Sequence, residues 1–176
     1  MNVVCVWCGR ELSPGKTGDP ISHGVCQACM HALIVRRGTA LTELLDQLDL
    51  PVIELDAGLT AVLANQAAEK AVGKKVDLIK GRLAGNVLQC IYAFTPEGCG
   101  RTIHCSGCTI RRTITATHQD GQPRYGVEAE QLVEHGAERQ LVHYRISTEK
   151  FRDSVLLIIE DVRMLAADSA PALPGH

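Results

Sequence analysis

Two Cys-x2-Cys pairs in the first 29 residues constrain the fold of this chain more than any other feature. Cys5 and Cys8 form the first pair, Cys26 and Cys29 form the second, and 17 residues lie between them. A Cys-x2-Cys turn points two thiolates at one metal ion, and two such turns complete the tetrahedral shell that Zn²⁺ prefers. We therefore expect a closed, structural zinc site with no open position for catalysis.

The segment around these pairs has little else to stabilise it. Residues 1–29 are rich in Cys, Gly and Pro, and residues 13–20 are typical of turns. Metal binding would supply the missing folding free energy, on the order of 10 kcal/mol. The alternatives are incidental cysteine pairs or a reversible dithiol. A covalent c-type haem is excluded because neither pair is followed by His.

A motif around the second pair resembles a known metal module. Residues 21–29 read Ile-Ser-His-Gly-Val-Cys-Gln-Ala-Cys, which is similar to a Ser-His-Gly-x-Cys-x-x-Cys segment. That segment occurs in short zinc-ribbon-like modules attached to bacterial PAS and response-regulator proteins. Since four cysteines already complete a tetrahedron, we expect His23 to lie behind the ligands or in a turn.

A second group of cysteines, Cys90, Cys99, Cys105 and Cys108, lies in the middle of the chain. The last two form a third Cys-x2-Cys pair at the start of a predicted helix, where a thiol has a lowered pKa. Four thiolates could hold a second zinc or an iron–sulfur cluster, and a Cys105–Cys108 or Cys99–Cys105 disulfide is a further option. Inert thiols, with Cys90 as a small buried hydrophobe, are the alternative.

Composition indicates a globular protein, with 45% hydrophobic and 22% charged residues in a chain of 176. A net charge of -2 gives no general attraction to nucleic acid or to an anionic membrane. The sequence has no secretory signal and no apolar run of ~18 residues that could span a membrane. We expect a cytoplasmic protein whose thiols stay reduced, which favours metal or redox roles over structural disulfides.

Helical periodicity follows the metal-binding segment, from Ala28 to Leu50. Leu41, Leu44 and Leu48 belong to one apolar stripe, Gly38 is a candidate break, and the proline at position 51 ends the helix. Such a helix either packs on its own domain or transmits a signal to a dimer mate. We predict a zinc-binding module, a linker helix, a sensor-type domain and a disordered tail, over residues 1–30, 31–49, 50–165 and 166–176.

Strand and helix patterns alternate after this helix. Asn65 and Gly73 are placed to cap a short helix between them. Residues 155–159 are continuously apolar, which predicts a strand buried on both faces at the centre of a sheet. The predicted strands are 52–55, 59–63, 125–133, 139–147 and 154–162, and a longer helix is predicted over 108–118.

This order of elements resembles a PAS domain, a five-stranded antiparallel sheet whose helices wrap one face around a small pocket. The likeness spans roughly residues 48–165. It is carried by Asn65-Gln66-Ala67-Ala68-Glu69 with Gly73, by the turn at 120–123 and by the closing strand at 156–162. Residues 90–108 are similar to a cysteine-bearing variety of PAS domain found in bacterial sensors, which implies a sensing site there. We predict an α+β fold with a PAS sheet behind a zinc module and a linker helix.

No phosphate-binding glycine loop or nucleophile motif is visible in the sequence, so we expect no catalysis. The resemblance implies a sensor of a small ligand, a metal or a redox state, which signals as a homodimer through contacts with a protein partner. The main alternative is a zinc-dependent, nucleic-acid-binding transcriptional regulator. Against it, only Arg10 and Lys16 are basic within residues 1–29. A redox enzyme using the second cysteine group is a third hypothesis.

Overall fold

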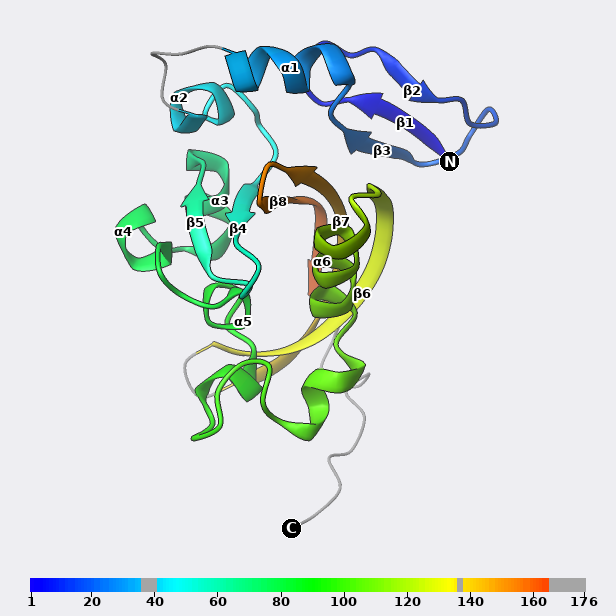
Figure 1. The fold of residues 1–176 in the computed structure, drawn as a ribbon. Helices are drawn as coiled ribbons and strands as arrows, with labels where there is room; N and C mark the ends of the chain where they lie inside the picture. Colours follow the sequence, from blue (N-terminus) through cyan, green and yellow to red (C-terminus); the bar gives the residue numbers. More distant parts are fainter. Residues whose placement is uncertain (36–40, 136–137, 165–176) are drawn as a thin grey trace.

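The computed structural model describes residues 1–35, 41–135 and 138–164. Their N-terminal part is a small sheet in the order β2-β1-β3, with β2 antiparallel and β3 parallel to β1 (Figure 1). The first helix, α1, begins within the second cysteine pair. The bounds are β1 Asn2–Cys5, β2 Glu11–Ser13, β3 Ile21–Gly24 and α1 Gln27–Val35.

A five-stranded antiparallel sheet forms the centre of the larger domain. Its strand order is β5-β4-β8-β7-β6, so the first strand of the domain pairs with its last. The long strands β6, β7 and β8 follow one another as hairpins. The bounds are β4 Val52–Leu55, β5 Ala61–Ala64, β6 Arg124–His135, β7 Glu138–Phe151 and β8 Ser154–Met164.

Helices cover one face of this sheet (Figure 1). The longest of them, α6, buries Ile110 and Ile114 in a core shared with the sheet. Short helices and two 3-10 turns, η1 and η2, complete the cover. The bounds are α3 Gln66–Val72, α4 Val76–Ile79, α5 Ala84–Val87, η1 Ile91–Phe94, η2 Ile103–Gly107 and α6 Thr109–Asp120.

The opposite face of the sheet is also covered. Along β8, Leu157 joins the helix-side core, whereas Leu156 and Ile158 point into a second core. This second core is completed by α2 (Leu41–Leu45) and by apolar side chains of the N-terminal segment, including Trp7. The prediction that residues 155–159 are buried on both faces is confirmed, because each of them is buried.

The predicted fold class is confirmed: an α+β domain with a five-stranded antiparallel sheet and helices on one face follows a four-cysteine segment. Both predicted caps of α3 are present. The Asn65 side chain accepts a hydrogen bond from the backbone of Ala68, and Gly73 ends the helix in the left-handed region at φ 65°.

The second strand starts later than predicted, at Ala61. The reason is local, since the Asp56 side chain accepts hydrogen bonds from the backbone N–H groups of Gly58 and Thr60 and extends the turn. The residue between them, Leu59, is buried with a positive φ of 63°.

The helix predicted from Ala28 to Leu50 ends early, because α2 stops at Leu45. Beyond it, the Asn65 side-chain amide donates hydrogen bonds to the carbonyls of Leu45 and Leu50 and holds this segment in a non-helical path. Leu44 and Leu48 are buried against the sheet, which supports the interpretation that this stretch packs on its own domain. Gly38 and the tail 166–176 lie outside the described residues. Among the described helices, none has the length and apolar character needed to cross a bilayer.

Candidate metal centre and cysteine-lined cavity

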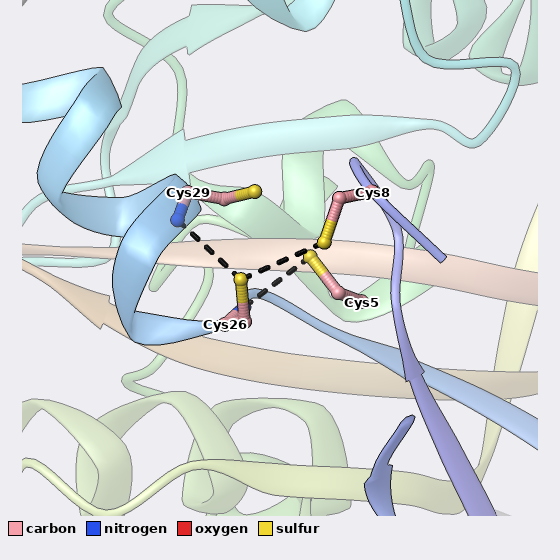
Figure 2. Close-up of side chains that lie close together, drawn as sticks. All are labelled: Cys5, Cys8, Cys26 and Cys29. Atoms are coloured by element: carbon pink, nitrogen blue, oxygen red, sulfur yellow. Dashed lines mark hydrogen bonds between the residues drawn. The ribbon is translucent and has the colours of Figure 1, made fainter. Parts of the chain in front are cut away.

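The four N-terminal cysteines converge, although they come from different elements. Cys5 ends β1, Cys8 follows in the next turn, Cys26 precedes α1 and Cys29 lies in its first turn. Their sulfur atoms all lie within 4.8 Å of one another (Figure 2). Cys5 and Cys26 are buried, whereas Cys8 is exposed.

The spacing of these sulfur atoms fits a tetrahedral metal ion. The Sγ atoms of Cys8 and Cys26 lie 3.7 Å apart. A tetrahedron with zinc–sulfur bonds of about 2.3 Å has sulfur–sulfur edges of about 3.8 Å. All four thiols are free, and a disulfide would require about 2.05 Å. The chemistry and geometry of this donor set therefore fit Zn²⁺.

Backbone pairing explains how the two cysteine pairs meet. The parallel register of β1 and β3 places Cys5 opposite Gly24, two residues before Cys26. After β1, the N–H of Gly9 donates to the carbonyl of Cys5 at 2.9 Å. Gly9 adopts a positive φ of 71°, which suits this tight turn. The turn carries Cys8 back toward the second pair.

Backbone N–H groups point at the sulfur atoms. The N–H of Cys26 donates to Cys5 Sγ at 3.3 Å, and the N–H of Cys29 donates to Cys26 Sγ at 3.4 Å. The latter hydrogen bond lowers the pKa of Cys26 to about 7, whereas burial raises the pKa of Cys29. Donors of this kind stabilise thiolates, which are the form that binds a metal.

The second cysteine group surrounds a cavity of about 320 Å³ on the helix side of the sheet. Cys90, Cys99, Cys105 and Cys108 all line it. The remaining lining is mostly apolar, and it includes Tyr92 and His104, whose rings stack with centroids 4.0 Å apart. The other lining residues come from α5, η1, η2, α6, β6 and β7, together with Leu59 and Leu88.

The cysteines of this cavity differ in their surroundings. Burial raises the pKa of Cys90 to about 11 and also raises that of Cys99. Burial acts against ionisation of Cys105 as well. For that thiol, the Thr102 hydroxyl, nearby backbone N–H groups and the Arg111 charge outweigh burial and lower the pKa. The surroundings of Cys105 thus favour the thiolate, whereas those of Cys90 and Cys99 favour the neutral thiol.

The two predicted sites therefore differ in geometry. Among the described residues, the N-terminal cysteines are the one group of three or more candidate ligands whose atoms all lie within 4.8 Å. The second group is brought together as the wall of a cavity. Its metal or redox role stays a prediction.

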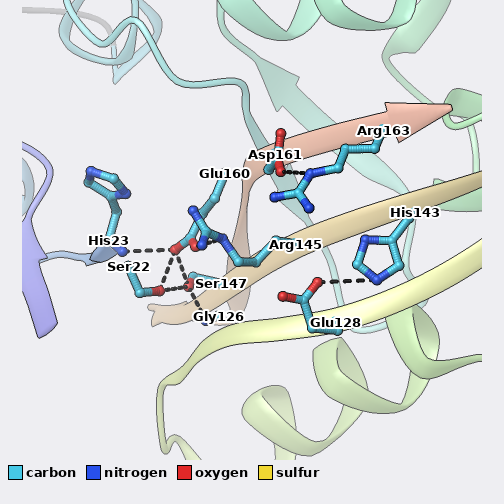
Figure 3. Close-up of polar contacts among 10 residues, drawn as sticks. All are labelled: Ser22, His23, Gly126, Glu128, His143, Arg145, Ser147, Glu160, Asp161 and Arg163. Carbon is cyan, nitrogen blue, oxygen red and sulfur yellow. Dashed lines mark hydrogen bonds and ion pairs between the residues drawn. The ribbon is translucent and has the colours of Figure 1, made fainter. Parts of the chain in front are cut away.

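Two acidic residues that sequence reasoning missed connect the cysteine segment to the sheet. Figure 3 shows the contacts of the first of them, Glu160. Glu160 on β8 accepts hydrogen bonds from Ser22 Oγ at 2.6 Å, from the backbone N–H of His23 at 2.8 Å and from Ser147 Oγ at 2.6 Å. Its other oxygen lies 3.1 Å from Arg145 Nε, and the Glu160 side chain is 0% exposed. The sequence feature that could have indicated this residue is a carboxylate directly after the apolar run of residues 155–159.

The second acidic residue, Glu149 on β7, holds the residue that directly follows β3. Its side chain accepts from the backbone N–H of Val25 at 3.0 Å and from the Tyr125 hydroxyl at 2.7 Å. Burial raises the pKa of Glu149, and these two donors oppose that effect. The residue after Val25 is Cys26, so the metal centre is anchored to the sheet one residue from a candidate ligand. His23, in contrast, is outside the ligand cluster, as expected.

Comparisons with known proteins gave matches among solved structures. No family model matches the sequence, and no curated protein is recognisably similar to it. Among solved structures, the photoactive yellow protein domain of the sensor histidine kinase Ppr from Rhodospirillum centenum is 14% identical with a TM-score of 0.44, and the match covers 70% of this chain and 95% of that chain.

Two further solved structures are described as PAS domains. That of nitrogen regulation protein NR(II) from Vibrio parahaemolyticus is 20% identical with a TM-score of 0.43, over 72% of this chain and all of the other (100%). That of BvgS from Bordetella pertussis is 14% identical with a TM-score of 0.43, over 70% of this chain and 84% of that chain. The fold assignment itself rests on the sheet order and helix cover described above.

Proposed function

We propose that this chain, which has a PAS-type fold behind a four-cysteine module, is a non-catalytic signal-sensing regulator. The cavity lined by Cys90, Cys99, Cys105 and Cys108 is the sensing site. It responds to a small ligand, a metal or a redox change, and the response passes to a protein partner or to a second copy of the chain.

The single observation that carries this proposal is the cavity. A space of about 320 Å³ is large enough for a small molecule, and four thiols face it. Thiols are the side chains most responsive to soft metals and to oxidants. The cavity also touches β6 and β7, whose far ends carry contacts to the N-terminal segment. A change in the cavity can therefore reach the opposite face of the sheet.

The N-terminal cysteines play a structural part in this proposal. One zinc ion is held by the thiolates of Cys5, Cys8, Cys26 and Cys29. These four ligands fill its coordination shell, so no position is left for a substrate. The ion stabilises a segment whose three short strands bury few side chains of their own. Metal analysis of protein purified without oxygen tests this part, and we expect one zinc per chain at this site.

Metal analysis and the colour of the same preparation also distinguish three states of the second cysteine group. One zinc and no colour would indicate free thiols in the cavity, two zincs would indicate a second structural site, and a brown protein with iron and sulfide would indicate an iron–sulfur cluster. Each state is compatible with sensing. Free thiols, a bound zinc ion and an iron–sulfur cluster can all be altered by an oxidant or by a change in metal concentration. The absence of zinc in a folded, reduced chain would contradict the proposed role of the N-terminal module.

Hydrogen exchange tests the sensing role directly. The cavity thiols are modified with a small alkylating reagent while zinc protects the N-terminal ones, and amide exchange is compared before and after. We expect altered protection beyond the cavity, in β7, β8 and the N-terminal segment. Changes confined to the loops that line the cavity would contradict the proposal.

A further inference from the structure

The sulfur of Cys105 lies in a cradle of hydrogen-bond donors. The backbone N–H of Gly100 lies 3.1 Å from Cys105 Sγ, and the Thr102 hydroxyl lies 3.2 Å from it. The Arg111 guanidinium packs directly against Gly100, where a Cβ atom would lie 2.4 Å from Nη1. Negative charge on this sulfur is thus stabilised from one side, while the residue also lines the cavity.

A second thiol is placed next to this cradle. Cys99 immediately precedes Gly100, the residue whose N–H binds Cys105 Sγ, and both cysteines line the same cavity. The missing side chain of Gly85 gives Cys99 its position, since a Cβ on Gly85 would lie 2.6 Å from Cys99 Sγ. Burial keeps Cys99 in the thiol form, as its raised pKa indicates. A stabilised thiolate and a neighbouring neutral thiol are the two parts that a two-step oxidation needs.

We propose that Cys105 is the reactive thiol of the cavity, that a hydroperoxide oxidises it, and that Cys99 then closes a disulfide with it. This inference deepens the proposed sensing function and rests on it. It assigns the signal a chemical class, the hydroperoxides, and gives each of the two cysteines a separate role.

Both steps balance without any further reagent. The Cys105 thiolate attacks the terminal oxygen of the hydroperoxide, so an S–O bond forms and the O–O bond breaks. The departing alkoxide, whose charge Arg111 stabilises, takes a proton and leaves as an alcohol, or as water when the oxidant is hydrogen peroxide. Cys99 then attacks the sulfenic sulfur, the S–S bond forms, and the hydroxyl leaves as water with the proton of the Cys99 thiol. Two thiols lose two electrons, and the peroxide gains them.

The test uses the full, zinc-loaded chain after reduction, with hydrogen peroxide and cumene hydroperoxide as the oxidants. Sulfenic acid is trapped with dimedone, and mass spectrometry measures the modification at each cysteine. We expect Cys105 to react first, at least about tenfold faster than Cys90, because the thiolate is the nucleophile. In Cys99→Ser the sulfenic acid should accumulate at Cys105, whereas the unsubstituted chain should form the Cys99–Cys105 disulfide.

A conservative variant tests the cradle itself. Thr102→Val removes one donor to the sulfur and keeps the shape of the side chain. The pH midpoint of reactivity should move upward, and the rate at pH 7 should fall about threefold, since the lost thiolate is partly offset by greater nucleophilicity. Thr95→Val is the matched control, because the Thr95 hydroxyl binds the carbonyl of Tyr92 and does not contact Cys105.

Several outcomes would overturn this inference. They are equal reaction at all cavity thiols, first reaction at Cys90 or Cys108, or a purified chain in which these thiols already hold a metal. The sensing proposal would survive all three, because a ligand or metal could still act through the cavity. Conversely, rapid oxidation of Cys105 without any change in hydrogen exchange beyond the cavity would confirm the thiol chemistry and contradict the sensing function.

Discussion

The Asn65 side chain makes four hydrogen bonds to the backbone of the elements around it. Its carboxamide oxygen accepts from the backbone of Val52 and of Ala68, and its amide donates to the carbonyls of Leu45 and Leu50. The residue is 0% exposed. One side chain thus starts α3, fixes the entry to β4 and ends the helical path of α2.

Replacing Asn65 by Ala should destabilise the chain by about 3 kcal/mol. The estimate combines a lost helix cap with buried backbone groups that are left unpaired. Asn65→Asp keeps the accepting oxygen, but it places a buried carboxylate oxygen against the carbonyls of Leu45 and Leu50, so it should destabilise at least as much at neutral pH. Urea unfolding followed by circular dichroism measures both values. Equal stability of Asn65→Ala and the unsubstituted chain would contradict this account.

Replacing Gly85 tests the second step of the proposed oxidation, in which Cys99 closes the disulfide with Cys105. A Cβ at position 85 would lie 2.6 Å from Cys99 Sγ and 3.3 Å from the Ala93 side chain, so Gly85→Ala should displace Cys99. We expect slower disulfide formation, while the first reaction of Cys105 with peroxide keeps its rate. Gly107→Ala is the control, since Gly107 also lines the cavity but a Cβ there meets nothing within 4 Å. Time-resolved mass spectrometry distinguishes the two steps, and equal effects of both variants would contradict the prediction.

The elements illustrate which parts of the fold are encoded locally. The caps Asn65 and Gly73 and the apolar run at 155–159 are short-range signals, so α3 and the central strand could be predicted. The convergence of the four N-terminal cysteines could also be predicted, because the Cys-x2-Cys spacing is local. Strands β1 to β3 have only three or four residues each and pair across the intervening turns, which leaves no periodic pattern to detect.

Docking of the cysteine segment on the sheet could not be predicted for a related reason. Glu160 lies 138 positions from Ser22 in the chain, and the hydrogen bond between them exists only in the folded state. The cavity could not be predicted either, because its wall is assembled from separate helices, turns and strands. The sequence shows four thiols close together, but their arrangement around a space depends on α5, α6 and the sheet.

Glu160→Ala tests this docking contact at the scale of elements. The substitution leaves Ser22, His23 and Ser147 without their shared acceptor and leaves Arg145 without its buried partner. We expect a loss of about 3 kcal/mol in the free energy of unfolding. The neighbouring Asp161→Ala is the control and should change stability by about 0.5 kcal/mol or less, because Asp161 pairs with the exposed Arg163. Similar values for the two variants would mean that β3 is not held through Glu160.

The described residues of the molecule form two hydrophobic cores that share one sheet. The helix-side core belongs to the PAS-type fold alone, but the second core combines side chains of β4, β7 and β8 with those of α2 and the cysteine segment. Val6 and Trp7, which lie between the candidate zinc ligands Cys5 and Cys8, pack against this second core. The N-terminal segment is therefore a layer of the domain, which makes metal binding and the stability of the sheet thermodynamically linked.

Metal removal provides the test of this linkage. Trp7 is the single tryptophan, so its fluorescence reports on the cysteine segment, whereas circular dichroism reports on the strands of the sheet. The two melting transitions should coincide in the zinc-loaded chain, and a chelator should lower both midpoints together, by roughly 10 °C, because the second core loses one of its walls. Cys26→Ser should reproduce the effect of the chelator, whereas Cys108→Ser should retain the response to it. If the chelator changes the Trp7 signal while the sheet melts at its original temperature, the segment is an independent module, and the acidic contacts at Glu149 and Glu160 do not couple it to the five-stranded sheet.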